Sequence, residues 1–203
     1  MDLSRYAFEA LRKDQEFILY RGQSEDASQV LVLAPAVQRP RPEGLNRLQH
    51  EYSLKEELDP CWATRPIAMA HHWDRPALLL MDPGGVPLSQ LLGPLRSDLD
   101  EHSRVASASA DAGEQPLALE FSLRLGISLS IAISHSHQCG LIHKDIKPAN
   151  VLVNSETDQC RLTGFGIASR LPRERQSPEP PEVIAGTLAY MAPEQTGRDE
   201  PLD

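Results

Sequence analysis

The run from His143 to Asn150, HKDIKPAN, constrains this 203-residue chain more than any other feature. It places an aspartate, Asp145, and an asparagine, Asn150, at a fixed spacing directly before an apolar segment, VLV, that is typical of a strand. The simpler reading is that Asp145 caps a turn and Asn150 satisfies backbone groups. The alternative is that both side chains are held on one rigid loop for chemistry.

Phosphoryl transfer requires that arrangement. A carboxylate must orient the attacking hydroxyl and accept its proton, while an amide oxygen holds a metal ion against the phosphates. Asp145 fits the first role and Asn150 the second. Lys147, two residues after the aspartate, is placed like the lysine with which serine/threonine kinases neutralise charge on the transferred group.

Two more motifs follow in order. At the position of the kinase sequence DFG, this chain has GFG, formed by Gly164, Phe165 and Gly166. The kinase sequence APE is present at the end of GTLAYMAPE, as Ala192, Pro193 and Glu194. With the loop, these residues resemble the bacterial serine/threonine protein kinase family. The run from HKDIKPANVLVN to GTLAYMAPEQTGR is similar to the N-terminal kinase-like module of large bacterial hybrid sensor kinases.

This resemblance implies an α+β, protein kinase-like two-lobe fold, with a small antiparallel β lobe carrying one helix and an incomplete helical large lobe. It implies ATP and magnesium as cofactors and a protein hydroxyl as acceptor. Thr187 would seat that hydroxyl near Asp145, and Glu51 would be the glutamate of the small-lobe helix. For Glu51 the alternative is a solvated charge on a helix surface.

Hydrophobic patterns favour the same order of elements. We expect residues 1–82 to form the small lobe and residues 83–95 the hinge and following turn. Within the small lobe, the patterns predict strands at 16–21 and 29–33, joined as a hairpin, a helix at 45–58, and strands at 66–71 and 77–81.

The second half divides by composition. Residues 96–116 are almost entirely small or polar, which favours a flexible insertion, and we expect 117–203 to form a partial large lobe. There the patterns predict a helix at 117–138 ended by Gly140, strands at 151–153 and 161–163, and a proline-rich loop over 171–182.

The sequence departs from the kinase pattern where nucleotide should bind. Gly164 replaces the aspartate that holds magnesium, and the strand sequence VLVLAP lies in a stretch without lysine between Lys13 and Lys55. Glu51 therefore lacks its usual partner, because Arg39 and Arg41 flank prolines in a loop and are expected to be solvated.

The segments expected to form the phosphate-binding loop and the hinge also differ from the kinase pattern. We assign the glycine-rich loop to YRGQSEDAS, which has one glycine and two acidic residues, Glu25 and Asp26, that would repel phosphates. Pro83 falls near the position where kinases offer a backbone N–H to adenine, and proline has none.

Composition excludes several functions. The 29 acidic and 20 basic residues give a formal charge of -9, which argues against nucleic acid or an anionic membrane as partner. Charges interrupt the N-terminal segment and no apolar stretch is long enough to cross a bilayer, so we expect a cytoplasmic protein without membrane insertion. Three cysteines without metal or redox spacing, Cys61, Cys139 and Cys160, are expected to be reduced thiols.

The sequence ends at Asp203, shortly after APEQTGR, which suggests a truncated domain without the helices that complete a large lobe and pair with Glu194. Such a chain would leave the apolar faces of the helix before the catalytic loop partly uncovered, and it would be marginally stable or depend on another polypeptide.

Two functions remain open. One is ATP-dependent phosphoryl transfer to protein hydroxyls, with Asp145 as base. The other is a pseudokinase, a regulatory or docking module whose nucleotide site has degraded; in either case the partner is a protein substrate or signalling protein. An interaction domain unrelated to kinases would explain the acidic composition but not three motifs in order.

Overall fold

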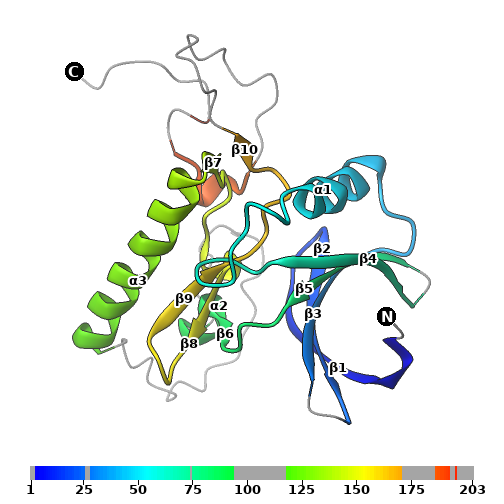
Figure 1. The fold of residues 1–203 in the computed structure, drawn as a ribbon, viewed down its shortest axis with the longest axis horizontal. Coiled ribbons are helices and arrows are strands. Elements are labelled where there is room, and N and C mark those ends of the chain that lie inside the picture. Colours follow the sequence, from blue (N-terminus) through cyan, green and yellow to red (C-terminus); the bar gives the residue numbers. More distant parts are fainter. Residues whose placement is uncertain are drawn as a thin grey trace, which may run out of the picture.

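The computed structural model describes residues 3–25, 28–73, 75–93, 118–170, 186–192 and 195. Two lobes lie side by side, one built on a sheet and the other on a long helix with short strand pairs (Figure 1). The predicted insertion 96–116, the proline-rich loop 171–182, and the motif residues Pro193 and Glu194 lie outside the described residues.

The small lobe is a five-stranded antiparallel sheet in the order β1-β2-β3-β5-β4. Its strands are β1 (Tyr6–Lys13), β2 (Phe17–Ser24), β3 (Gln29–Pro35), β4 (Pro66–His72) and β5 (Arg75–Met81), and a short 3₁₀ helix, η1 (Leu3–Arg5), precedes them. The structure confirms the predicted hairpin and both later strands. It also contains β1, for which we predicted no strand.

The sheet is covered on both faces, which explains the unbroken apolar run in β3. Leu31 and Leu33 face a cluster that includes Leu48 of the helix α1 (Pro42–Ser53). Val30 and Val32 face the opposite side, where Tyr6 and Phe8 of β1 pack against the cluster. A strand buried on both faces needs apolar residues at every position rather than alternation.

Helix α1 begins three residues earlier than predicted, because Pro42 in its first turn supplies a preset φ at a position whose N–H is not needed. It ends at Ser53, and the chain continues to Glu57 as turns, so the predicted end at residue 58 was too late.

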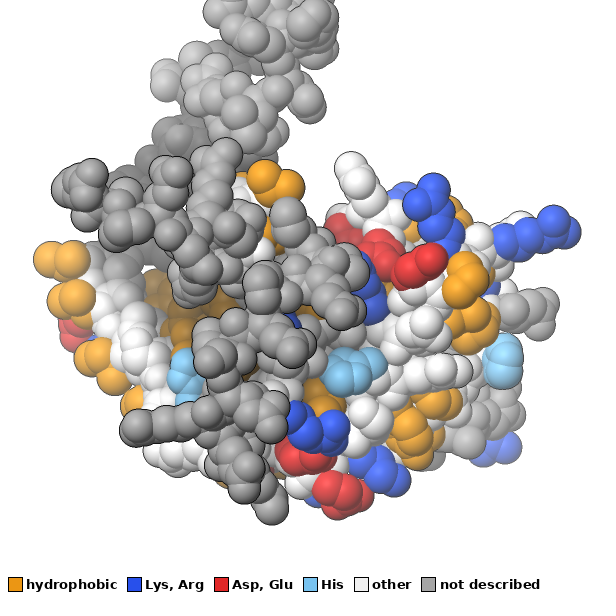
Figure 2. Space-filling model, turned by 90° about the horizontal axis from the view of Figure 1, so that it is seen from above, with side chains coloured by type: hydrophobic (Ala, Val, Ile, Leu, Met, Phe, Trp, Pro, Cys, Tyr) orange, Lys and Arg blue, Asp and Glu red, His pale blue; other side chains and the backbone are white. Residues whose placement is uncertain are grey.

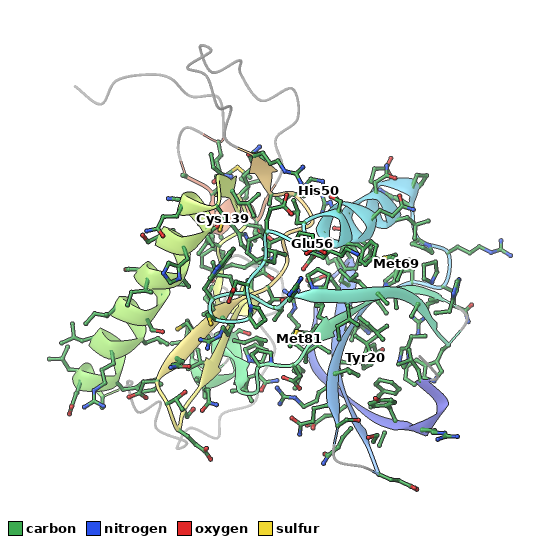
Figure 3. The ribbon with its side chains drawn as sticks, in the orientation of Figure 1. Tyr20, His50, Glu56, Met69, Met81 and Cys139 are labelled. Atoms are coloured by element: carbon green, nitrogen blue, oxygen red, sulfur yellow. The ribbon has the colours of Figure 1, made fainter. Side chains whose placement is uncertain are left out.

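The chain leaves the sheet after Met81 (Figure 3) and enters the second lobe through two glycines with positive φ, Gly84 and Gly85. Only Gly85 is crowded, since a Cβ there would lie 2.3 Å from the Val153 carbonyl oxygen, whereas at Gly84 the nearest atom is 3.7 Å away.

Gly84→Ala should therefore cost about 1–2 kcal/mol from the left-handed backbone alone. Gly85→Ala should cost about 3 kcal/mol, because the β8 backbone must also move. Urea denaturation of both variants measures the difference, and equal losses would contradict the close approach of Gly85 to the β8 backbone.

Among its described residues, the second lobe contains two short sheets, with strand orders β6-β8-β9 and β10-β7, two α-helices and two 3₁₀ helices. Its elements are β6 (Val86–Pro87), α2 (Leu88–Leu91), α3 (Leu119–Gln138), β7 (Leu141–Ile142), η2 (Pro148–Asn150), β8 (Val151–Asn154), β9 (Gln159–Leu162), β10 (Ser169–Arg170) and η3 (Leu188–Tyr190). The predicted helix corresponds to α3, and Gly140 follows it with φ +74° as a terminator. The predicted strands correspond to β8 and to β9, which begins two residues earlier than expected.

Helix α3 lies at the margin of the molecule, where Figure 2 shows hydrophobic side chains on the surface. Leu119, Leu123, Ile127 and Ile131 recur every fourth residue and are 75%, 60%, 62% and 52% exposed. The opposite face packs into the lobe through Leu125 and Ala132. The spacing of the four exposed residues also led us to expect a mostly buried helix, which is wrong for this face; among the described residues it is exposed, as expected for a partly uncovered helix. Among the described helices, none combines the length and hydropathy needed to span a membrane.

Candidate functional site

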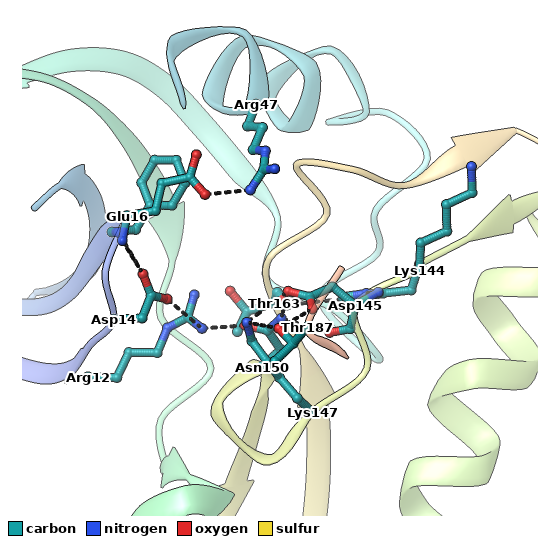
Figure 4. Close-up of polar contacts among 12 residues, drawn as sticks. Arg12, Asp14, Glu16, Arg47, Lys144, Asp145, Lys147, Asn150, Thr163 and Thr187 are labelled. Carbon is teal, nitrogen blue, oxygen red and sulfur yellow. Dashed lines mark hydrogen bonds and ion pairs between the residues drawn. The ribbon is translucent and has the colours of Figure 1, made fainter. Parts of the chain in front are cut away.

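A cavity of about 440 Å³ lies between the two lobes. The small lobe contributes β1, the β1–β2 turn, β3 and α1, and the second lobe contributes the HKDIKPAN loop and the segments around Gly164 and Thr187. The volume falls within the range of small-molecule sites. Most residues that the sequence singled out therefore meet at one place, and Figure 4 shows the polar contacts that join them.

Three predicted residues form one hydrogen-bonded group. Lys147 Nζ lies 3.0 Å from Asp145 Oδ2 and donates to Thr187 Oγ1 at 2.7 Å. The Thr187 hydroxyl donates to Asp145 Oδ1 at 2.8 Å. Both carboxylate oxygens of Asp145 are therefore bound, one by Lys147 and the other by Thr187. Lys144, in the same loop, points away from the group (Figure 4).

Asn150 is buried and ties this group to the small lobe. Its Nδ2 donates to the backbone oxygen of Asp145 at 2.8 Å and to Asp145 Oδ2 at 2.9 Å. Its Oδ1, the atom that we predicted to hold a metal ion, accepts a hydrogen bond from a guanidinium nitrogen of Arg12 in β1.

Glu51 is buried at the inner face of α1, with 1% of its surface exposed, so the alternative of a solvated charge is wrong. Its Oε1 accepts the Gly164 N–H at 3.3 Å. Burial raises the pKa of Glu51 to about 7, although the backbone N–H groups of Phe165 and Gly164 and the charge of Arg12 act in the opposite direction.

Phe165 is the part of the GFG motif that enters the core. Its ring lies 5.9 Å from that of Trp62 and 4.4 Å from that of His143, measured between centroids. His143 bonds through Nε2 to the Thr163 carbonyl oxygen at 3.1 Å, and burial lowers its pKa to about 4. His50 lies in the last turn of α1 (Figure 3). Its Nε2 forms a hydrogen bond of 2.7 Å with the backbone oxygen of Ala168, which follows the GFG motif in the sequence.

The glycine-rich loop was assigned to the wrong hairpin. YRGQSEDAS covers the end of β2 and the turn to β3, whereas the turn that lines the cavity joins β1 to β2 at Asp14–Glu16. That turn contains no glycine. Asp14 Oδ1 accepts the N–H groups of Glu16 at 2.9 Å and Phe17 at 2.7 Å, so a side chain occupies backbone donors that a glycine loop would offer to phosphate.

Arg12 was missed for the same reason. Because no strand was predicted before Glu16, nothing in the sequence analysis placed an N-terminal arginine beside the HKDIKPAN loop. The alternation of aromatic, apolar and polar residues in YAFEALRK was the available signal. Arg47 of α1 also lines the cavity and pairs with Glu16, while Arg39 and Arg41 are exposed as expected.

The polar groups of the hinge are bound within the protein. Arg21 of β2 donates to both carboxylate oxygens of Asp82, at 2.5 and 3.0 Å, and to the Gly85 backbone oxygen at 2.7 Å. Asp82 Oδ1 accepts the Gly84 N–H at 2.8 Å, and the intervening residue is Pro83, which has no N–H.

The residues present do not fit a kinase magnesium site. Mg²⁺ in such sites takes octahedral oxygen ligands, including one or two carboxylates. Here Gly164 offers no side chain, and Asn150 Oδ1 is bound by Arg12. Within the part of the chain that the structure describes, no three or more His, Cys, Asp or Glu side chains are grouped to hold a metal ion.

Comparison with known proteins agrees with the fold. Residues 123–202 match the family described as "Protein kinase domain". The serine/threonine-protein kinase mos of Patiria pectinifera is 45% identical over 62 residues, which are 30% of this chain and 18% of the relative. Its counterpart from Sus scrofa is 39% identical over 83 residues, 41% of this chain and 23% of the relative.

The serine/threonine-protein kinase PknB of Mycolicibacterium smegmatis is 34% identical over 88 residues, which are 43% of this chain and 14% of the relative. The chain thus spans less than a quarter of the length of these relatives. Together with the antiparallel sheet lobe and the few helices described, these matches support a protein kinase-like domain with an incomplete two-lobe fold.

Proposed function

We propose that this chain is a pseudokinase: a kinase-like signalling domain that serves as a regulatory or docking module for a protein partner, without phosphoryl transfer. The observation that carries the proposal is the contact between Arg12 and Asn150 Oδ1. It removes one magnesium ligand in a site where Gly164 has already removed the other.

The hinge supports the same proposal. Kinases bind adenine through backbone groups of the hinge, but here Asp82 and Arg21 already occupy the Gly84 N–H and the Gly85 oxygen. Beside the hinge, residues of both lobes pack together in one apolar cluster, in which Leu11, Leu80 and Leu152 are at most 5% exposed. An adenine ring would have to separate these side chains.

The second candidate is an active serine/threonine kinase that uses ATP and magnesium. The group of Asp145, Lys147 and Thr187 favours it, since the carboxylate is oriented and paired as a base for an acceptor hydroxyl would need to be. The relatives mos and PknB are serine/threonine-protein kinases, which agrees with this candidate.

In either case we propose a cytoplasmic module of a larger signalling protein, similar to the N-terminal kinase module of hybrid sensor kinases. The acidic composition, with 29 acidic against 20 basic residues, favours a protein partner over nucleic acid.

A thermal-shift titration with ATP, with and without Mg²⁺, distinguishes the candidates. A ligand that binds only the folded state stabilises it by about 2.7 kcal/mol at one hundred times its Kd. We expect no change in Tm at millimolar ATP under either condition. A magnesium-dependent rise in Tm that Asn150→Ala abolishes, measured against that variant's own Tm, would favour the active kinase and reject the pseudokinase.

A further inference from the structure

Arg12 crosses from one lobe to the other. Its backbone belongs to β1, near the edge of the small-lobe sheet, and its guanidinium reaches the catalytic loop (Figure 4). Only 9% of the side chain is exposed, and its Nε has no hydrogen-bond partner among the described residues. An arginine is rarely buried to this extent unless its charge is balanced by neighbouring groups.

The balancing groups are the acids of the cavity. Burial lowers the pKa of Arg12, while Asp14, Glu51 and Asp145 act in the opposite direction. One Arg12 nitrogen lies 3.9 Å from Asp14 Oδ2. Of the other two cations that line the cavity, Lys147 shares Asp145 with Arg12, and Arg47 pairs with Glu16.

We propose that the Arg12 guanidinium takes the place of the divalent cation in this cleft, binding Asn150 Oδ1 and balancing Glu51 and Asp145, so that the site excludes divalent metal ions. This inference deepens the proposed function and rests on it, because it explains how a kinase-like cleft keeps its acidic residues without magnesium. Arg12 is then a positioning residue that joins the lobes through Asn150.

The backbone at Gly164 belongs to the same arrangement. Its φ is +85°, and a Cβ there would lie 3.0–3.2 Å from the amide atoms of Asn150. The Asn150 amide is held in that place by Arg12 on one side and Asp145 on the other. A side chain at position 164 would push the amide by a few tenths of an ångström, so glycine at this position suits an Asn150 amide that Arg12 and Asp145 hold in place.

Mn²⁺ alone, without nucleotide, is the probe for this inference. The wild-type protein should show no saturable Mn²⁺ binding by electron paramagnetic resonance. Arg12→Met keeps the apolar length of the side chain but removes the cation, and it should bind Mn²⁺ at least about tenfold more tightly than the wild type. Asn150→Ala in the Arg12→Met background should remove that gain.

Arg47→Met is the matched control, because it also removes one positive charge from the cavity but leaves Asn150 Oδ1 bound to Arg12. It should bind Mn²⁺ no better than the wild type. Equal gains in both variants would show a general charge effect and overturn the assignment to Arg12, as would a folded Arg12→Met protein that gains no Mn²⁺ binding.

A measurement on the wild type covers the case in which Arg12→Met does not fold. In a ¹H–¹⁵N spectrum of the wild type, added Mn²⁺ should broaden the side-chain amide resonance of Asn150 no more than the resonances of buried residues elsewhere in the protein. Selective broadening of the Asn150 resonance would overturn the inference. These outcomes are separable from the proposed function. A rise in Tm with metal-free ATP would contradict the blocked adenine site of the proposed function but not the exclusion of metal, whereas selective Mn²⁺ broadening contradicts the exclusion alone.

Discussion

Replacing Phe165 with alanine should destabilise the protein by about 3–5 kcal/mol, the range found when a large buried aromatic side chain is removed. Phe165 is 0% exposed and packs between Trp62 and His143, so it joins the GFG segment to the core of the second lobe. Single domains of this size have free energies of unfolding of about 5–15 kcal/mol. At the lower end of that range, the variant would retain at most about 2 kcal/mol.

Urea denaturation followed by circular dichroism measures this loss. Leu188→Ala is the control, because Leu188 is 82% exposed and its removal should change the free energy of unfolding by less than about 0.5 kcal/mol. A loss below about 1 kcal/mol for Phe165→Ala would mean that the site refills easily and that Phe165 does not anchor the motif.

Replacing Glu51 with glutamine should stabilise the protein at pH 8 by up to about 3 kcal/mol. In the folded protein the pKa of Glu51 is raised from 4.5 to about 7, mainly by burial. The folded state therefore binds this proton more tightly than the unfolded chain. The contribution of Glu51 to stability is complete below pH 4.5 and is lost as the pH rises to about 7, at about 1.4 kcal/mol per pH unit.

The quantity to measure is the difference in free energy of unfolding between Glu51→Gln and the wild type, from pH 4.5 to pH 8. It should grow with pH and level off above pH 7. Glu56→Gln is the control, since Glu56 is an exposed residue nearby that pairs with Arg65, and its difference should stay nearly constant. A flat difference for Glu51→Gln would show that Arg12 keeps the Glu51 carboxylate ionised despite its burial.

The sequence was most informative where a local pattern and a local structure coincide. The β2–β3 hairpin, the strands β4 and β5, and helix α3 with its terminator Gly140 follow from hydrophobic periodicity and turn chemistry over short distances. The roles given to Asp145, Lys147, Asn150 and Thr187 stay predictions, but the structure does bring these residues together.

The missing strand shows where such reasoning stops. β1 is an edge strand with one buried residue, Leu11, and several exposed ones, so its pattern is weak. Because β1 was not predicted, the glycine-rich loop was assigned to the β2–β3 turn instead of the β1–β2 turn. The missed strand also hid Arg12, whose partners Glu51, Asp145 and Asn150 lie at least 39 positions away in the sequence.

By itself, the sequence determined the order of the elements after β1, the motif HKDIKPAN, and the absence of a lysine in VLVLAP and of an aspartate at position 164, because each is carried by residues close together along the chain. Only the tertiary structure decided which groups surround Glu51 and Asn150. The pKa of Glu51 depends on how deeply that side chain is buried. The hydrogen-bond partner of Asn150 Oδ1 depends on which side chain of the small lobe lies opposite it. Burial and electrostatics act through space, and the chain brings Arg12 to the catalytic loop only when both lobes are folded.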